Sequence, residues 1–223
     1  MVRKEKKYAI IVAAIAIVTL SLMLSSCTKD ASEGEAEMNT ISPYQMSSEE
    51  SDLAGLLTSH ESFNSIVQFA VDESYEHVYV GYDYYEKGKL IEDEGAEMEV
   101  NLSDEEEPQA SSGKICAMIT GDRVDINVMA GGSETEDKNM SSSSSSLAES
   151  GHSFSNLDST ATSSLSETVS VGNGEKIPVW AYIGSDKDTL SVPEVKSLME
   201  DKEIFNSYDK CCVFYAKFAQ KQD

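Results

Sequence analysis

Basic residues are scarce in this chain of 223 residues, which has 17 lysines and arginines against 40 aspartates and glutamates. The formal net charge is −23 at pH 7. A surface this acidic repels phosphate backbones and anionic lipid headgroups, and self-repulsion keeps the chain soluble. We therefore expect no nucleic-acid partner.

Metal-binding motifs are also lacking. The three histidines are His60, His77 and His152, and none has a cysteine, histidine or acidic partner at the short spacing of a zinc motif. Two acidic segments, residues 104–107 and 185–188, lack the spacing of a helix-loop-helix calcium site. We expect solvated charge clusters there, with no metal and no cofactor.

No catalytic motif is complete. The segment GHSFS, Gly151 to Ser155, approaches the nucleophile elbow G-x-S-x-G, but serine replaces the final glycine and a serine-rich stretch precedes it. We expect the chain not to be an enzyme. The alternative is a cell-wall hydrolase whose acidic residues are brought together only by the fold.

The N-terminal segment has the layout of a secretory signal peptide. A short basic stretch, MVRKEKKY, precedes an uncharged apolar run at residues 9–24, and small residues follow. Leu24, Ser25, Ser26 and Cys27 then resemble the lipobox of bacterial lipoproteins. The resemblance implies that residues 1–26 are a cleaved signal peptide and that Cys27 becomes the lipid-bearing first residue, anchored in the cell membrane and facing outside the cytoplasm.

The alternative is an uncleaved membrane anchor. Sixteen helical residues span about 24 Å, which is short of the roughly 30 Å hydrocarbon core, so we favour lipidation. Residues 27–46 are poor in aliphatic side chains and predict a flexible tether. The remaining residues, 47–223, are expected to form a single extracytoplasmic domain.

Most of that domain has the alternating pattern of β-strands. A tyrosine-rich strand from Tyr75 to Tyr85 meets a turn near Gly88, and a second hairpin turns at Gly121 and Asp122. Residues 177–184, IPVWAYIG, hardly alternate, which predicts a strand covered on both faces with Trp180 in the core.

Two short helices and one loop complete the prediction. One helix is expected near residues 47–60, and the other follows Pro193. Residues 130–150 include six consecutive serines without periodicity, and we expect a disordered serine-rich loop there. The fold class is mainly β (β-rich α+β), either an antiparallel β-sandwich or a partly open barrel.

The cysteines beyond Cys27 have two interpretations. Cys116 can bond to Cys211 or Cys212 outside the cytoplasm if their strands are neighbours. Alternatively, all three are buried thiols that act as small apolar side chains.

One face of the tyrosine-rich strand is a candidate ligand-binding surface. Tyr79 and Tyr85 share that face with His77 and Asp83, and amphipathic rings in solvent suit contacts with sugars or proteins. We therefore expect a membrane-anchored module that binds a protein or an envelope glycan.

Overall fold

The structure is a computed structural model that describes residues 37–57, 62–91, 95–102, 109–132, 139–147 and 152–221. These residues belong to one compact unit, Ala36–Asp223. The expected signal peptide, Cys27 and the first part of the tether lie outside the described residues. Within the described ranges, no helix is long and apolar enough to span a bilayer.

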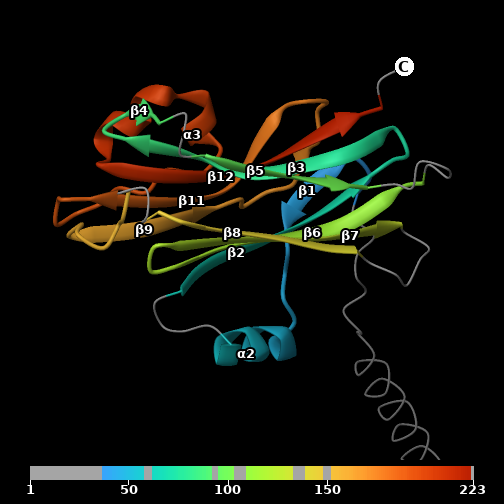
Figure 1. Cartoon of the computed structure of the whole chain (residues 1–223), viewed down its shortest axis with the longest axis horizontal. Coiled ribbons are helices and arrows are strands. Elements are labelled where there is room, and N and C mark those ends of the chain that lie inside the picture. The colour runs from blue at the N-terminus through green and yellow to red at the C-terminus, as the bar shows by residue number, and fades with distance from the viewer. Residues whose placement is uncertain are drawn as a thin grey trace, which may run out of the picture. The chain divides into compact units, whose positions relative to one another are not determined.

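Two antiparallel sheets make up the fold (Figure 1). Sheet A has the strand order β10-β1-β2-β6-β7-β8, and sheet B has the order β4-β3-β12-β11-β9, with β5 also paired to β3. Sheet A contains β1 (Thr40–Pro43), β2 (Ser62–Val71), β6 (Ser111–Thr120), β7 (Arg123–Gly132), β8 (Asn139–Ser146) and β10 (Val169–Ser170). Sheet B contains β3 (Tyr75–Glu86), β4 (Lys89–Leu90), β5 (Ala96–Asn101), β9 (Ser159–Ser164), β11 (Lys176–Ser185) and β12 (Lys210–Gln220).

The sheets face each other and do not close into a barrel (Figure 1). The fold is therefore a β-sandwich, which confirms the mainly β prediction and decides between its two forms. Both predicted hairpins are present, and their turns use glycines with positive φ, +80° at Gly88 and +61° at Gly121. Glycine adopts this backbone conformation without the Cβ clash of other residues.

Aromatic side chains fill the space between the sheets. Trp180 is fully buried, as predicted, and its ring centroid lies 4.8 Å from that of Phe214. Phe69 of sheet A meets Phe218 of sheet B edge-on at 5.3 Å. Every residue of β11 from Ile177 to Ser185 is buried, which confirms the strand covered on both faces.

The first predicted helix is α2 (Ser48–Leu57), which lies on the side of sheet A away from sheet B (Figure 1). Ser47 and Glu50 form a reciprocal capping box in which each side chain accepts from the other's backbone N–H. The Tyr44 hydroxyl also donates to Glu50 at 2.6 Å, and the Lys114 ammonium lies 3.6 Å from the Tyr44 ring centroid. These contacts connect the start of α2 to β6.

The second predicted helix is shorter than expected and is split in two. A single turn, α3 (Ser197–Glu200), is followed by the 3₁₀ helix η2 (Lys202–Ser207). Asp201 has an extended backbone, with φ −127° and ψ 97°, and its carboxylate accepts from the Glu203 N–H. Asp201 therefore ends α3 and caps η2.

The tether prediction is wrong at its C-terminal end, because residues 40–43 form β1. Ile41 is completely buried between the sheets. Immediately before β1, Asn39 has φ +57°, and its side-chain amide exchanges two hydrogen bonds with the side chain and backbone N–H of Asp72. The Asn39 carbonyl oxygen also accepts from the Val171 N–H. The sandwich thus begins at about residue 39, not at residue 47.

The prediction of a disordered serine-rich loop is also wrong where the structure describes this segment. Residues 139–146 form β8 and pair with β7 along their whole length. Ser145 Oγ lies 2.9 Å from the Tyr82 hydroxyl of sheet B, and Arg123 Nε donates to Ser144 Oγ at 3.0 Å. A strand whose backbone is paired by a neighbour needs no apolar side chains of its own, so composition alone misjudged it. Residues 133–138 and 148–151 lie outside the described ranges.

Candidate binding face

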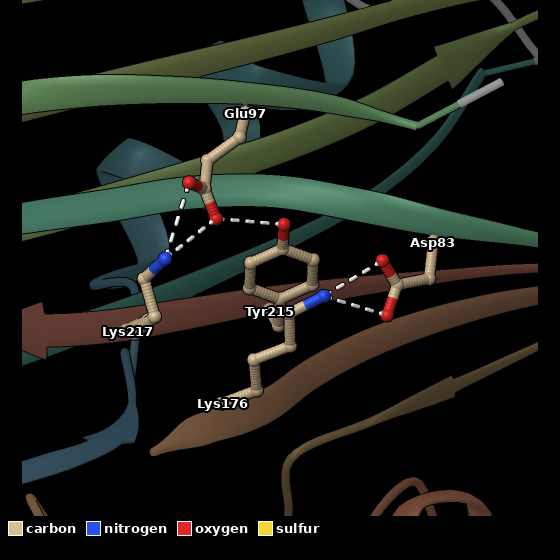
Figure 2. Close-up of polar contacts among 5 residues, drawn as sticks. All are labelled: Asp83, Glu97, Lys176, Tyr215 and Lys217. Carbon is tan, nitrogen blue, oxygen red and sulfur yellow. Dashed lines mark hydrogen bonds and ion pairs between the residues drawn. The ribbon is translucent and has the colours of Figure 1, made fainter. Parts of the chain in front are cut away.

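The outer face of sheet B is divided into a covered half and an uncovered half. The segment containing α3 and η2 packs on the first half, where Phe205 and Leu198 are buried. The Phe205 ring stacks on Tyr85 with centroids 3.9 Å apart and planes 5° apart. The second half carries polar side chains from β3, β5, β11 and β12, and we call the group drawn in Figure 2 the polar array: Asp83, Glu97, Lys176, Tyr215 and Lys217.

The centre of the polar array is a row of three residues on neighbouring strands. Tyr215 of β12 lies opposite Gly81 of β3, which lies opposite Glu97 of β5. Because Gly81 has no side chain, the Tyr215 ring extends across β3, and its hydroxyl donates to Glu97 Oε2 at 2.9 Å (Figure 2). An aromatic ring that covers a glycine on the next strand protects an otherwise bare part of the sheet.

Two lysines flank this row and would repel each other without counter-charges. Lys176 and Lys217 lie directly opposite each other on β11 and β12. Their ammonium groups turn to different carboxylates, with Lys176 2.8 Å and 2.9 Å from the Asp83 oxygens and Lys217 3.0 Å and 3.1 Å from those of Glu97 (Figure 2). The Lys176 ammonium also lies 3.9 Å from the Tyr215 ring centroid. Cross-strand like charges are thus neutralised within the array.

The electrostatics of the array keep Tyr215 protonated. Burial raises the pKa of its phenol strongly, and the hydrogen bond to Glu97 and the negative charges of Glu97 and Asp83 raise it further. The phenol is therefore a neutral hydrogen-bond donor at physiological pH. Both carboxylates of the array already accept from lysine, and Glu97 also accepts from tyrosine. The five side chains of the array are thus paired with one another.

Tyr79 lies at the edge of the array and is half-buried. The Lys217 ammonium lies 4.4 Å from its ring centroid, and the His77 ring is 6.2 Å away. His77 Nδ1 in turn lies 2.9 Å from Asn101 Oδ1 and 3.1 Å from Glu99 Oε1. Tyr79 is thus a partly exposed ring surrounded by charged and polar groups.

Tyr85 differs from Tyr79, although both were predicted to face solvent. Only 7 % of Tyr85 is exposed, because Phe205 covers its ring. Burial also raises the pKa of Tyr85 to about 12, with smaller contributions from Asp83 and Cys211. The structure therefore does not bring the two tyrosines into one exposed patch, and the expectation of an exposed ring is wrong for Tyr85.

The remaining cysteines are free thiols. Cys211 and Cys212 are buried on β12, and burial raises the pKa of both thiols well above the ordinary value. Cys116 is half-buried on β6 of the other sheet, and burial again raises its pKa. Of the two interpretations left open, the structure therefore shows reduced thiols held largely as apolar side chains.

From His152 onward, the GHSFS segment forms a turn that is held by hydrogen bonds to Asp122. Gly151 lies outside the described residues. The Ser153 hydroxyl donates to the Asp122 carboxylate at 2.7 Å and 2.8 Å, and the Phe154 N–H donates to Asp122 as well. Of the two acidic segments, residues 104–107 lie outside the described residues, and in residues 185–188 the Asp186 N–H donates to the Asp209 carboxylate. Among the described residues, no group of three histidine, cysteine or acidic side chains is placed to hold a metal ion.

Four members of the polar array were missed by sequence reasoning: Glu97, Lys176, Tyr215 and Lys217. Part of the signal was present, because Tyr215 and Lys217 alternate with the core residues Phe214 and Ala216. The missing part was the strand order, since residues 97, 176 and 217 become neighbours only when β3 and β12 pair centrally in sheet B.

These features define the class of the molecule as a two-sheet β-sandwich domain with a charge-paired outer face. A family model described as the YgaN domain matches residues 40–218, from the first residue of β1 to near the end of β12. The match spans most of the chain, and the chain belongs to the YgaN domain family. No curated protein and no solved structure matches the chain.

Proposed function

We propose that this chain is a bacterial lipoprotein, anchored to the cell membrane through Cys27, whose extracytoplasmic sandwich binds a protein or an envelope glycan. The anchor is supported by the basic, apolar and small-residue order of residues 1–26 and by the lipobox-like residues before Cys27. A family match that begins at residue 40 agrees with an N-terminal segment distinct from the folded domain.

The observation that carries the binding function is the setting of Tyr79. Its ring lies on the half of sheet B that α3 and η2 leave uncovered, beside the ammonium group of Lys217 and the imidazole of His77. A partly exposed aromatic ring that is bordered by donors and acceptors can cover the apolar face of a sugar or an interface side chain and fix its orientation. The neighbouring charges are paired, so binding would not require burial of a free charge.

The anchor is tested by labelling cells with a radioactive fatty acid and separating membranes from soluble protein. We expect labelling and membrane association of the unaltered chain, and loss of both in Cys27→Ala. The matched control is Cys116→Ala, which removes another free thiol and should remain labelled. Label that persists in Cys27→Ala would contradict lipidation at this residue.

The binding face is tested with the purified chain on a glycan array and in pull-downs from envelope extracts. We expect Tyr79→Ala to lower binding at least tenfold, equivalent to about 1.4 kcal/mol. Tyr44→Ala is the matched control, because Tyr44 is also half-buried and also carries a lysine over its ring, but on the other sheet. Array hits without pull-down partners identify a glycan ligand, and the reverse result identifies a protein. Equal binding by both variants would rule out this face.

A further inference from the structure

The backbone of β8 forms an open edge of sheet A. Among the described residues, β7 is the only strand that pairs with β8. In an antiparallel ladder, alternate residues of an edge strand point their N–H and C=O groups away from the sheet. The pairing of β8 with β7 continues over eight residues without a bulge, so β8 is a long and regular edge.

Other edges in the described part of the sandwich are short or protected. β4 and β10 have two residues each, and β5 carries Glu97 and Glu99. On β9, the Ser163 hydroxyl donates to the carbonyl oxygen of Pro193, so the segment before α3 lies against that strand. β8 has no proline, no charged side chain and no bulge, which are the usual means of preventing edge-to-edge pairing.

Charge also distinguishes this edge from the rest of the molecule. The chain carries a net charge of −23, so most surfaces of two copies repel each other. β8 consists of Asn139, Met140 and six serines, all uncharged. Next to it on β7, Arg123 and Asp125 form an ion pair at 2.9 Å and neutralise each other. β8 itself is therefore uncharged, and the two glutamates of β5, the strand of sheet B that lies beside it, are paired with Lys217 and His77.

We propose that β8 pairs antiparallel with the β8 strand of a second copy of this chain around a two-fold axis. Residues opposite each other in a sheet point to the same face, so one residue must lie opposite its own copy, with the axis midway between the two. The two positions nearest the centre of the strand are Ser142 and Ser143. Pairing there places serines opposite serines and joins the two A sheets into one continuous sheet.

This dimer edge belongs to sheet A, whereas Tyr79 of the proposed binding face lies on the outer face of sheet B. Serine side chains are small and cannot clash across the new ladder, and every outward backbone group of the central residues gains a partner. Met140, which is 77 % exposed, would then lie beside a serine of the second copy on the outer face of sheet A. The proposal also accounts for the absence of charged residues from β8, because like charges opposite each other across the new ladder would repel.

Cysteine cross-linking of the full chain in cell membranes tests the arrangement. Under mild oxidation, Ser142→Cys or Ser143→Cys should give a disulfide-linked dimer, because the residue nearest the axis lies opposite the same residue of the second copy. The matched control is Ser164→Cys, an exposed serine on the edge strand β9 of the other sheet. The unsubstituted chain gives the background from Cys116, Cys211 and Cys212. No dimer above background at either β8 position, or equal cross-linking at Ser164, would overturn the proposal.

Sedimentation of the full chain in detergent gives an independent test. We expect the unaltered chain to form a dimer. Its dissociation constant should be at least tenfold lower than that of Ser142→Lys/Ser144→Lys, in which like charges face each other across the axis. Ser164→Lys should leave the dimer unchanged. Circular dichroism checks that each variant is folded. A monomer in the unaltered chain at all accessible concentrations would overturn the proposal.

Discussion

The hydroxyl of Tyr215 occupies the space in front of Gly81, where any side chain would meet it. A Cβ atom at position 81 would lie 3.0 Å from that hydroxyl and 2.2 Å from the carbonyl oxygen of Ala96. Gly81→Ala should therefore push β5 away from β3 and lower the free energy of unfolding by about 1–3 kcal/mol. Urea unfolding measures the change. Gly121→Ala is a useful comparison, because a Cβ there would have no atom within 4 Å and only the strain of φ +61° would act.

The hydrogen bond from Tyr215 to Glu97 should contribute measurably to stability. Tyr215→Phe keeps the ring under Lys176 but removes the donor, and we expect a loss of about 1 kcal/mol in the free energy of unfolding. A double-mutant cycle with Glu97→Ala, which removes the acceptor, isolates the pair, and the expected coupling is about 0.5–1.5 kcal/mol. A coupling energy of zero would show that the contact does not stabilise the fold.

Tyr79 and Tyr85 lie on one strand face but should respond differently to truncation. Tyr85→Ala removes the ring stacked on Phe205 and should cost about 3–5 kcal/mol in unfolding free energy, as large aromatic truncations in cores do. Tyr79→Ala removes a half-buried ring and its contact with Lys217, for an expected cost of about 1 kcal/mol. Thermal and urea unfolding distinguish the two. Equal costs would contradict the different burial of these rings.

Acid should weaken the hydrogen bonds between Asn39, which precedes β1, and Asp72, which follows β2. Hydrogen bonds from the Ser74 side chain, from Asn39 and from the Ser74 backbone lower the pKa of Asp72 below its ordinary value of 3.8. The folded state thus favours the carboxylate, and this stabilisation is present above the unfolded-state pKa and lost as the pH falls through the lower folded-state pKa.

Asp72→Asn tests this dependence. The variant should be less stable than the unaltered chain at about pH 7, and the difference should shrink as the pH falls below about 4. Unfolding curves across that pH range measure it. Asp209, whose pKa is lowered mainly by the Asp186 N–H, titrates in the same direction and remains in both proteins. A difference that grows on acidification would contradict the assigned sign.

The sequence was most informative where local pattern alone decides structure. The Gly121 hairpin, the Tyr75 strand and the doubly covered strand containing Trp180 were predicted because alternation, turn glycines and apolar content all agree there. The residues of β1 and β8 were not predicted. Their side chains carry little strand signal, and their structure depends on backbone partners in β2 and β7 that are distant in the chain.

The candidate site was predictable only in part, for a similar reason. Tyr79 follows from strand alternation, but its exposure depends on how far η2 extends over sheet B. Phe205 reaches Tyr85 and not Tyr79, and no local pattern sets that limit. The contacts of Glu97 with Tyr215 and Lys217 join residues more than 115 positions apart, so only the strand order places them together.

The hydrogen bonds between Asn39 and Asp72 have a mechanical consequence. In a chain anchored through Cys27, as we propose, a pulling force enters the sandwich at Asn39, at the start of β1. There the load is shared by the Asp72 side chain, the Asp72 N–H and the Val171 N–H before it reaches the ladder between β1 and β2. Several hydrogen bonds would thus oppose separation of β1 from the sandwich under such a force.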